Sequence, residues 1–318
     1  MTTPITFPFP VSSTGLLQGH VIHNTICRCC NCRRAHNKTK GDQRCWADDN
    51  FARCGNTKEK INVREGGCCL VSKSQSCRFL CLRCLKKTNF FQPCFAEFLG
   101  VTLFVFIGCT SVYNTGGNIV GIAFAHGLSI ALLIIATGSI SGGHLNPAVT
   151  LGILISGAIT PFKAILYVVA QVLGGILGAG ISRGVLGDEL YKNISGGAHD
   201  LSAHVSVGEG VLCEVMLTAM LVTVILSSAV DPKTKNVLAP LGIGFTVVAD
   251  ILAGGGITGA SMNPARSFGP AIVVSYAKNV WTNHWIYWVA PSVGASFAAV
   301  CYRLVLASPE NRFIKPQN

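Results

Sequence analysis

The sequence has few charged residues. Asp, Glu, Lys and Arg together make up 12% of its 318 residues, about half of the roughly 25% that is usual in soluble domains. This shortage excludes an ordinary water-soluble globule of this size. Hydrophobic residues make up 50% of the chain and glycine occupies 35 positions. That composition is typical of a membrane-embedded protein, in which Gly is common and backbone polar groups must bond to one another.

The charges that are present are unevenly distributed. Residues 1–93 hold 15 Lys and Arg against 5 Asp and Glu, whereas residues 94–318 hold 10 against 9. Between Glu97 and Lys163, 65 consecutive residues carry no charged side chain. Because one bilayer crossing takes about 20 residues, this gap must contain several spans and the turns between them.

Six apolar runs are each about long enough to cross a bilayer. They lie at residues 95–112, 119–137, 162–182, 211–230, 237–253 and 283–306. Two shorter runs, at 147–157 and 264–275, predict half-helices. Residues 1–19 lack the basic segment and the apolar core of a secretory signal, so we expect the N-terminus to stay in the cytosol.

An internal repeat with an offset of 117 residues relates two parts of the chain. Its matched elements are Asn146-Pro147-Ala148 with Asn263-Pro264-Ala265, Glu97 with Glu214, and Ser141-Gly142-Gly143 with Thr258-Gly259-Ala260. Each copy has three crossings and one half-helix, so the second copy enters from the opposite face. Inverted repeats of this kind place the functional site at the midplane. We therefore expect a tail at 1–92, a membrane domain at 93–307 made of repeats 93–183 and 210–307, and a C-terminal tail at 308–318.

The basic residues just before the first span predict the topology. They are Lys73, Arg78, Arg83, Lys86 and Lys87. By the positive-inside bias this tail is cytosolic, and six crossings return the C-terminus to the cytosol. The connection from Arg183 to Glu209 is then outside, where Asn193 in Asn193-Ile194-Ser195 is a candidate glycosylation site.

The two Asn-Pro-Ala boxes predict a pore. Asn is a favoured N-cap and Pro suits the first helical position, so half-helices that start at Pro147 and Pro264 would point their positive dipole ends at the bilayer centre. The Asn146 and Asn263 side chains can donate hydrogen bonds into the lumen, and the preceding loops offer backbone carbonyls as acceptors. The candidate carbonyls are those of Gly142, Gly143, His144, Ser261 and Met262. A water whose oxygen accepts from both amides cannot easily relay a proton.

These features together resemble the aquaporins of the major intrinsic protein family. The resemblance rests on the twin boxes, with Ser141-Gly142-Gly143-His144-Leu145 before one and Arg266-Ser267-Phe268-Gly269-Pro270 after the other. It implies an all-α membrane protein with six transmembrane helices and two re-entrant half-helices in an inverted repeat. It also implies a homotetramer with one pore per subunit. Gly174 and Gly178 form a small-residue step that favours close helix packing.

The resemblance places the selectivity filter on four residues, which are His126, Ile251, Ala260 and Arg266. An intramembrane Arg is costly and by default functional. The set resembles the aquaammoniaporin (aquaporin eight type) subgroup and the vacuolar plant relatives. An apolar Ile in the filter should widen it and lower its polarity, so ammonia and hydrogen peroxide join water as expected permeants.

Some positions depart from the family patterns. Ser261 stands where the subgroup has a cysteine, which weakens the case for thiol-based gating. Ser267, where glycerol channels have Asp, argues against a glycerol channel, and Tyr287 and Trp288 match the water-type pattern.

Three carboxylates lie within predicted spans. The resemblance implies that Glu97 and Glu214 hydrogen-bond the re-entrant loops, whereas a transporter would use them as proton carriers. Asp250, beside Ile251, either tunes the filter or is satisfied by a neighbouring helix.

The N-terminal tail is rich in cysteine. Of 15 cysteines, 11 precede residue 90, and three pairs have zinc-like spacing, namely Cys27/Cys30, Cys29/Cys32 and Cys81/Cys84. A cytosolic location disfavours disulfides. Zinc binding, palmitoylation or lipid contact, and a mobile disordered tail without a role all remain open.

The sequence therefore predicts a passive channel for water, and also for ammonia and hydrogen peroxide, that excludes protons and ions. It predicts no enzyme chemistry, cofactor, resident metal or nucleic-acid partner. The expected partners are water, small neutral solutes, membrane lipid and three further copies of the chain. The expected location is the plasma membrane or an intracellular membrane. The alternatives are a proton-coupled secondary transporter and a zinc-binding regulatory protein that acts through its tail.

Overall fold

The structure is a computed structural model that describes residues 46–48, 51–53, 61–62, 90–274 and 280–313. The chain divides into two units, Met1–Thr88 and Asn89–Asn318. In the first unit, the described residues are three short antiparallel strands in the order β1-β2-β3. They are β1 (Trp46–Asp48), β2 (Phe51–Arg53) and β3 (Ile61–Asn62). No alternating apolar pattern indicated these strands. The cysteine pairs lie outside the described residues, and disorder in the rest of the tail stays a prediction.

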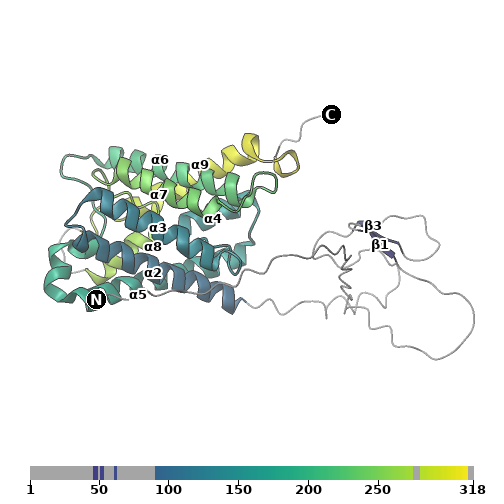
Figure 1. Ribbon diagram of the computed structural model, residues 1–318. Coiled ribbons are helices and arrows are strands. Elements are labelled where there is room, and N and C mark those ends of the chain that lie inside the picture. The colour runs from purple at the N-terminus through teal and green to yellow at the C-terminus, as the bar shows by residue number, and fades with distance from the viewer. Residues whose placement is uncertain (1–45, 49–50, 54–60, 63–89, 275–279, 314–318) are drawn as a thin grey trace, which may run out of the picture. The chain divides into compact units, whose positions relative to one another are not determined.

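The second unit is a helical bundle (Figure 1). Its helices are α2 (Phe91–Asn114), α3 (Ile119–Thr137), α4 (Pro147–Ser156), α5 (Pro161–Asn193), α6 (Val207–Ile225), α7 (Ala239–Gly254), α8 (Pro264–Val273) and α9 (Ile286–Cys301). The π-helical turns η3 (Leu226–Val230) and η4 (Tyr302–Leu306) extend α6 and α9, and the short 3-10 turns are η2 (Ser195–Gly197) and η5 (Pro309–Asn311). The offset of 117 residues maps the first residues of α4 and α8 onto each other, so α2 to α5 and α6 to α9 are the two repeats.

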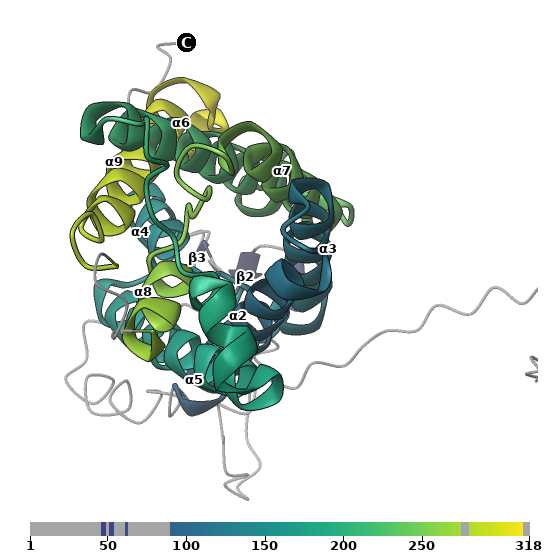
Figure 2. The same ribbon diagram turned by 90° about the vertical axis from the view of Figure 1, so that its left-hand side faces the viewer.

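Among the described residues, five helices are long and apolar enough to cross a membrane, namely α2, α3, α5, α6 with η3, and α9 with η4. The sixth, α7, has 16 residues and spans about 24 Å at 1.5 Å per residue. It packs along α3, its counterpart in the other repeat. Seen end on, the long helices form a ring, and α4 and α8 lie on one side of it (Figure 2). The expected fold of six spans and two half-helices is confirmed.

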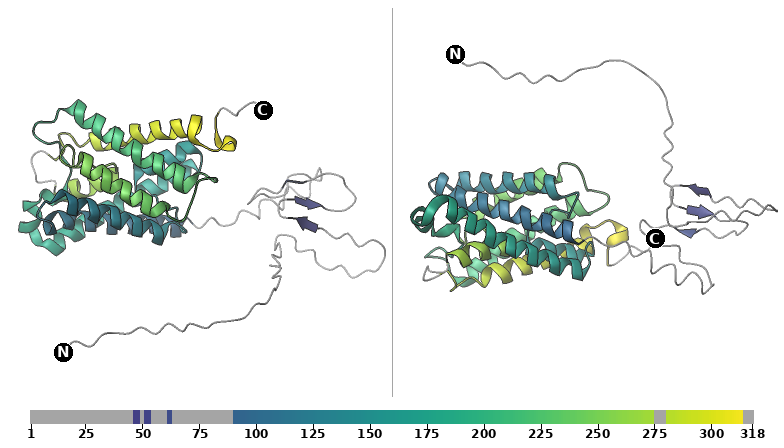
Figure 3. Two further views of the ribbon diagram at one scale, coloured as in Figure 1. Left: turned by 45° about the horizontal axis from the view of Figure 1, so that its top comes forward. Right: turned by 90° about the horizontal axis from the view of Figure 1, so that it is seen from below.

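The helices of the ring run along a common axis (Figure 3), and many large apolar side chains on them are exposed. These side chains include Leu132, Phe162, Leu212, Phe245 and Phe297. In water such a surface would be a large apolar patch, whereas in a bilayer it faces hydrocarbon. The arrangement is that of a multi-pass membrane protein.

Helix α5 is longer than the third span that the sequence predicted. It continues through Asn193, with a break at Gly187 (φ 75°, ψ 165°), so the predicted external connection from Arg183 begins about ten residues too early. Hydropathy measures the length of chain that suits lipid, and a helix can continue beyond the bilayer. The Arg183 Nε to Asp188 Oδ1 ion pair, at 2.6 Å, lies in this extension.

Glycines set the approach of α5 to its neighbours. A Cβ atom on Gly174 would lie 2.4 Å from the carbonyl oxygen of Phe98, and one on Gly178 would lie 2.4 Å from that of Thr102. The predicted small-residue step thus packs directly on the α2 backbone. Gly269 of α8 is equally constrained, because a Cβ there would lie 2.2 Å from the Gly175 carbonyl oxygen. These contacts fix one half-helix against the ring.

Asp231 joins three segments at the end of the bundle where α6 and α9 finish. Its carboxylate accepts hydrogen bonds from Lys233 N (2.9 Å), Tyr302 Oη (2.9 Å), Ser308 N (2.8 Å) and the Ser308 hydroxyl. Burial by itself raises the pKa of Asp231, but the bonds from Ser308, Lys233 and Tyr302 outweigh it and hold that pKa well below the ordinary 3.8. The carboxylate therefore anchors the chain after α9 to the connection before α7.

Replacing Asp231 by Asn should lower stability, because an amide presents N–H groups to donors. We expect a loss of about 1 to 3 kcal/mol, seen as a lower thermal midpoint in detergent at pH 7. Because the folded-state pKa is depressed, the stabilisation is present at neutral pH and is lost as pH falls below about 4. Asp188→Asn, which removes a carboxylate from an exposed ion pair, is the matched control and should change little. Equal shifts for the two variants would contradict the anchoring role.

Candidate functional site

The two half-helices begin with the same cap. Asn146 Oδ1 accepts hydrogen bonds from Ala148 N (2.8 Å) and Val149 N (3.4 Å), and Pro147 follows as the first helical residue. In the second repeat Asn263 Oδ1 accepts from Ala265 N (3.1 Å) and Arg266 N (3.3 Å). The caps leave the two side-chain amide groups as donors.

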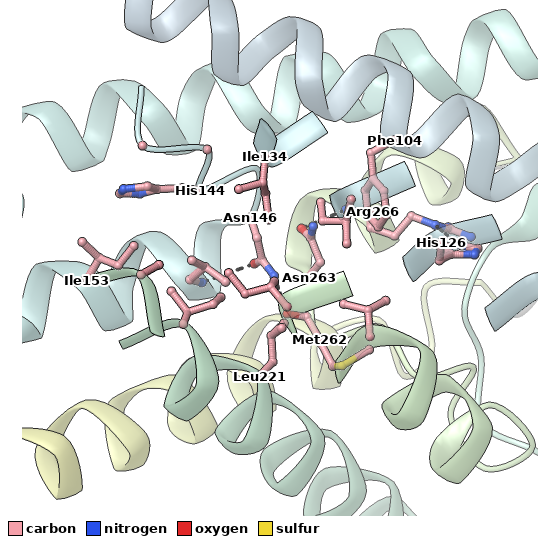
Figure 4. A pocket seen from close by; sticks show the side chains of 18 of the residues that line it. Phe104, His126, Ile134, His144, Asn146, Ile153, Leu221, Met262, Asn263 and Arg266 are labelled. Atoms are coloured by element: carbon pink, nitrogen blue, oxygen red, sulfur yellow. Dashed lines mark hydrogen bonds between the residues drawn. The ribbon is translucent and has the colours of Figure 1, made fainter. Parts of the chain in front are cut away.

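These amide groups link the repeats. Asn146 Nδ2 donates to Met262 O at 2.8 Å, and Asn263 Nδ2 donates to Leu145 O at 3.0 Å. Because an amide NH₂ carries two hydrogens, each Asn keeps one for another acceptor. Both side chains line a shared cavity, where they meet at its centre (Figure 4). The helix N-termini behind them each contribute roughly half a positive charge at this point.

Two buried carboxylates hold the loops in place. Glu97 accepts from Ser141 Oγ (2.5 Å), His144 N (3.0 Å), Leu145 N (2.6 Å) and Gln171 Nε2 (2.8 Å). The four hydrogen bonds of Glu97 connect α2 with α5 and with the re-entrant loop that precedes α4.

Glu214 makes the corresponding bonds to Thr258 Oγ1 (2.6 Å), Ser261 N (2.8 Å) and Met262 N (2.8 Å). The loops need this support, because Leu145 and Met262 have positive φ angles of 50° and 53°. Such a conformation costs a non-glycine residue about 1 to 3 kcal/mol.

The cavity has a volume of about 340 Å³ and extends to both sides of the Asn pair. The five residues whose carbonyls were expected to face the lumen, Gly142, Gly143, His144, Ser261 and Met262, all line it. Met262 O bonds to Asn146. Within the described residues no protein donor reaches the carbonyl oxygens of the other four. Acceptors thus remain free on both sides of the central donors.

All four predicted filter residues line the cavity, and His126 and Arg266 lie together on one side of the Asn pair (Figure 4). Arg266 is buried; its Nε donates to His126 Nε2 at 3.2 Å and its Nη1 donates to Gly197 O at 2.9 Å. His126 Nδ1 lies 2.8 Å from Ile122 O, an acceptor, so we assign the proton to Nδ1 and the lone pair to Nε2. His126 is then neutral, with both nitrogens occupied. Ile251 and Ala260 contribute apolar side chains to the same cavity.

Three features of this region were missed by sequence reasoning. Gly108 makes room for the pair, since a Cβ there would lie 2.5 Å from His126 Nε2. Gly197 supplies a carbonyl to Arg266. His199 lines the cavity, and its Nδ1 lies 2.8 Å from Ser267 Oγ. Burial, aided by the positive charge of Arg266, holds the pKa of His199 well below its ordinary value. The connection between α5 and α6 carried no periodic pattern that could reveal Gly197 or His199.

Comparisons with known proteins agree with this geometry. The family model described as "Major intrinsic protein" matches residues 84–302, which is more than half of the chain. The chain belongs to the major intrinsic protein family. Aquaporin-8 of Rattus norvegicus is 42% identical over 229 residues, covering 71% of this chain and 86% of the relative. The probable aquaporin TIP3-2 of Arabidopsis thaliana is 40% identical over 237 residues, covering 68% and 84%.

A solved structure resembles this aquaporin as well. The aquaglyceroporin from Plasmodium falciparum aligns with a TM-score of 0.62 and 26% identity, covering 69% of this chain and 97% of that one. This aquaporin is therefore an integral membrane channel for water or small solutes, and it is not an enzyme.

The remaining predicted residues have clear positions in this aquaporin. Asn193 is exposed at the end of α5. Ser261 and Ser267 are buried and share a hydrogen bond between their hydroxyls. Asp250 is buried but does not line the cavity, and among the described residues its Oδ2 has no hydrogen-bond partner. The described residues contain no group of three His, Cys, Asp or Glu suited to a metal ion.

Proposed function

We propose that this aquaporin conducts water in single file and also conducts ammonia and hydrogen peroxide, while it excludes protons and ions. The observation that carries this proposal is the pair of Asn146 and Asn263 amides in one cavity, each with a free N–H. A water at this point donates only outward, to the acceptors on either side, because its oxygen accepts from the protein. This polarity reversal opposes proton relay, and two helix N-termini oppose cations.

The filter geometry supports the wider choice of permeants. His126 holds Arg266 through the Nε2 bond and offers no spare nitrogen to the lumen, while Ile251 and Ala260 offer none at all. Among the four filter residues, polar side-chain contacts for a permeant therefore come from the remaining Arg266 N–H groups, and His199 is a further polar side chain that lines the cavity. Ammonia and hydrogen peroxide are close to water in size and accept such bonds.

Roles for the other residues follow from their contacts. Glu97 and Glu214 are structural supports of the loops. Neither lines the cavity, and the carboxylate of each accepts hydrogen bonds from several protein donors. A proton-coupled transporter that used these carboxylates would need them in the path, and among the described residues that line the cavity there is no carboxylate.

We infer a homotetramer from the family resemblance, and cytosolic termini from the basic segment before α2. Native mass spectrometry in detergent tests the assembly, and protease access in sealed vesicles tests the topology.

The experiment that tests the main proposal is stopped-flow light scattering of vesicles that contain the protein. We expect rapid shrinkage in an osmotic gradient with a low activation energy. An ammonium gradient should change the internal pH quickly without a proton current, and a trapped peroxide dye should respond faster than in empty vesicles. Shrinkage no faster than that of empty vesicles would refute water conduction, and loss of the other two signals alone would restrict the channel to water.

Replacing His126 by Ala should broaden the size of permeant that passes. The change removes the ring that holds Arg266 Nε and empties space beside Gly108. We expect urea and methylammonium uptake to rise at least several-fold while water conduction continues. Ile134→Ala, which truncates a cavity residue beside Asn146 and away from His126 (Figure 4), is the control for volume alone. A similar rise in both variants would argue against a filter at His126.

A further inference from the structure

The charge that lines the cavity is all of one sign. Among the described residues that line it, the only formal charges are those of Arg266 and Lys163, and no carboxylate is present. Arg266 lies on one side of the Asn pair, beside His126 and Phe104. Lys163 comes from the start of α5, directly after the Ala158 and Ile159 that line the cavity beyond α4. The two cations therefore lie at opposite mouths.

The internal repeat does not place a second arginine at the mouth opposite Arg266. With the offset of 117 residues, the position that matches Arg266 is Val149, and Val149 also lines the cavity. The first repeat thus supplies no charged group where the second supplies an arginine. Val280, the residue that matches Lys163, does not line the cavity. Each repeat consequently contributes one pore cation, from a different element.

The position of Lys163 in its helix is electrostatically unfavourable. It is the third residue of α5, where the helix dipole favours acidic side chains and disfavours a lysine. It also makes no ion pair with any described residue; its Nζ lies 5.1 Å from the centroid of the Tyr167 ring. Nor does it neutralise the nearby C-terminus of α4, because Arg303 Nη1 bonds to Ser156 O at 2.9 Å there. A local preference of the helix is thus broken, and the favourable contact that Lys163 makes is the one with the Tyr167 ring; such a departure is typical of a functional position.

The contacts of Lys163 connect it to the pore wall. Tyr167 Oη donates to Ser141 O at 2.7 Å, and the ring packs edge-on against His144 with centroids 5.2 Å apart. His144 is itself a cavity residue. The Lys163 ammonium group lies over the Tyr167 ring, which is itself held by its hydroxyl bond to Ser141 and by its packing against His144. These contacts keep the positive charge near the mouth of the pore. The positive end of α5 adds to the same potential.

We propose that Lys163 is a second specificity-determining residue, a fixed positive charge that lowers the concentration of ammonium and other monovalent cations at the mouth opposite Arg266. The inference rests on the proposed function, namely a pore that passes neutral solutes and excludes cations. Arg266 alone would repel cations that enter from its own side of the Asn pair. An ammonium ion that enters from the other side is repelled first by Lys163. Neutral ammonia and water are unaffected by the charge.

The test uses whole-cell current recordings, because all copies then share one orientation. The Arg266→Val background opens the filter to cations, and ammonium or potassium carries the current. We expect Arg266→Val alone to give a rectifying current, with cation entry from the Lys163 mouth about two- to fivefold weaker than from the other. Adding Lys163→Gln should abolish the rectification, and adding Lys163→Glu should reverse it. Lys163→Arg keeps the charge and should keep the rectification.

Two further measurements distinguish an effect of the Lys163 charge from a general loss of channel function. The rectification should fade as ionic strength rises from 0.02 to about 1 M, since a surface charge is screened over about a Debye length. Osmotic swelling of the same cells reports water conduction. If swelling is absent in every variant, the proposed function fails. If swelling is normal but the rectification is unchanged in Lys163→Gln, or the double variant carries no cation current, the role of Lys163 is overturned.

Discussion

Replacing Arg266 by Val is expected to raise the permeability of the channel to monovalent cations about 30- to 700-fold. The guanidinium is buried in the cavity wall, where His126 and Gly197 O hold it. A fixed charge about 4 Å from a passing ion contributes about 2 to 4 kcal/mol to the barrier at an intermediate dielectric. Removing it lowers that barrier, while the Asn pair still receives water. Reversal-potential measurements with single salts give the permeability directly.

The control for this variant is another arginine outside the pore. Arg183→Val removes a charge from the exposed extension of α5 and should leave cation permeability at its wild-type level. Arg266→Lys keeps a charge but cannot reproduce both bonds, so we expect an intermediate permeability. Cation exclusion that survives in Arg266→Val would mean that the helix ends and Lys163 are sufficient, and the filter assignment would then be wrong.

Replacing either loop-supporting glutamate by Gln should destabilise the fold by about 2 to 4 kcal/mol. In each variant an N–H group replaces an acceptor oxygen that faces backbone N–H groups of a re-entrant loop. The loop then loses part of the support that holds Leu145 or Met262 at a positive φ angle. We expect a lower thermal midpoint and a smaller folded fraction in size-exclusion chromatography. Water conduction per folded molecule should fall as well.

The matched control is Glu209→Gln, which changes an exposed capping-box carboxylate at the start of α6. It should cost less than about 1 kcal/mol. If Glu97→Gln and Glu214→Gln behave like this control, the two carboxylates do not support the loops. A transporter-like role would instead show as altered proton coupling with unchanged stability.

The sequence was most informative where local chemistry and the repeat agreed. The Asn-Pro-Ala boxes predicted the starts of α4 and α8, because N-cap and first-turn preferences are local. The matched offset paired Glu97 with Glu214, and the structure brings each carboxylate to its own loop. Burial and packing at the small-residue step on α5 also followed from residue size. These inferences needed no knowledge of distant contacts.

The sequence was least informative where irregular backbone meets a side chain far along the chain. Gly197 O and His199 reach Arg266 and Ser267 across about 70 residues, and no period or motif marks such contacts. The length of α5 was underestimated because hydropathy stops at the lipid boundary. For Asp250 the sequence left two roles open. The structure provides no hydrogen-bond partner for Oδ2 among the described residues and places Asp250 outside the cavity lining, so both roles stay open.

The reciprocal bonds of Asn146 and Asn263 have a mechanical consequence. Each amide donates a hydrogen bond to the backbone of the other repeat. Two hydrogen bonds between the repeats, rather than the packing of flexible side chains, thus fix the width of the pore at its centre. The centre of the pore therefore cannot widen gradually. A slightly larger solute passes only if one of these hydrogen bonds breaks, and the two repeats then lose their relative alignment. Changes in solute selectivity must therefore come from residues nearer the mouths of the pore, where no such bonds fix the lining residues.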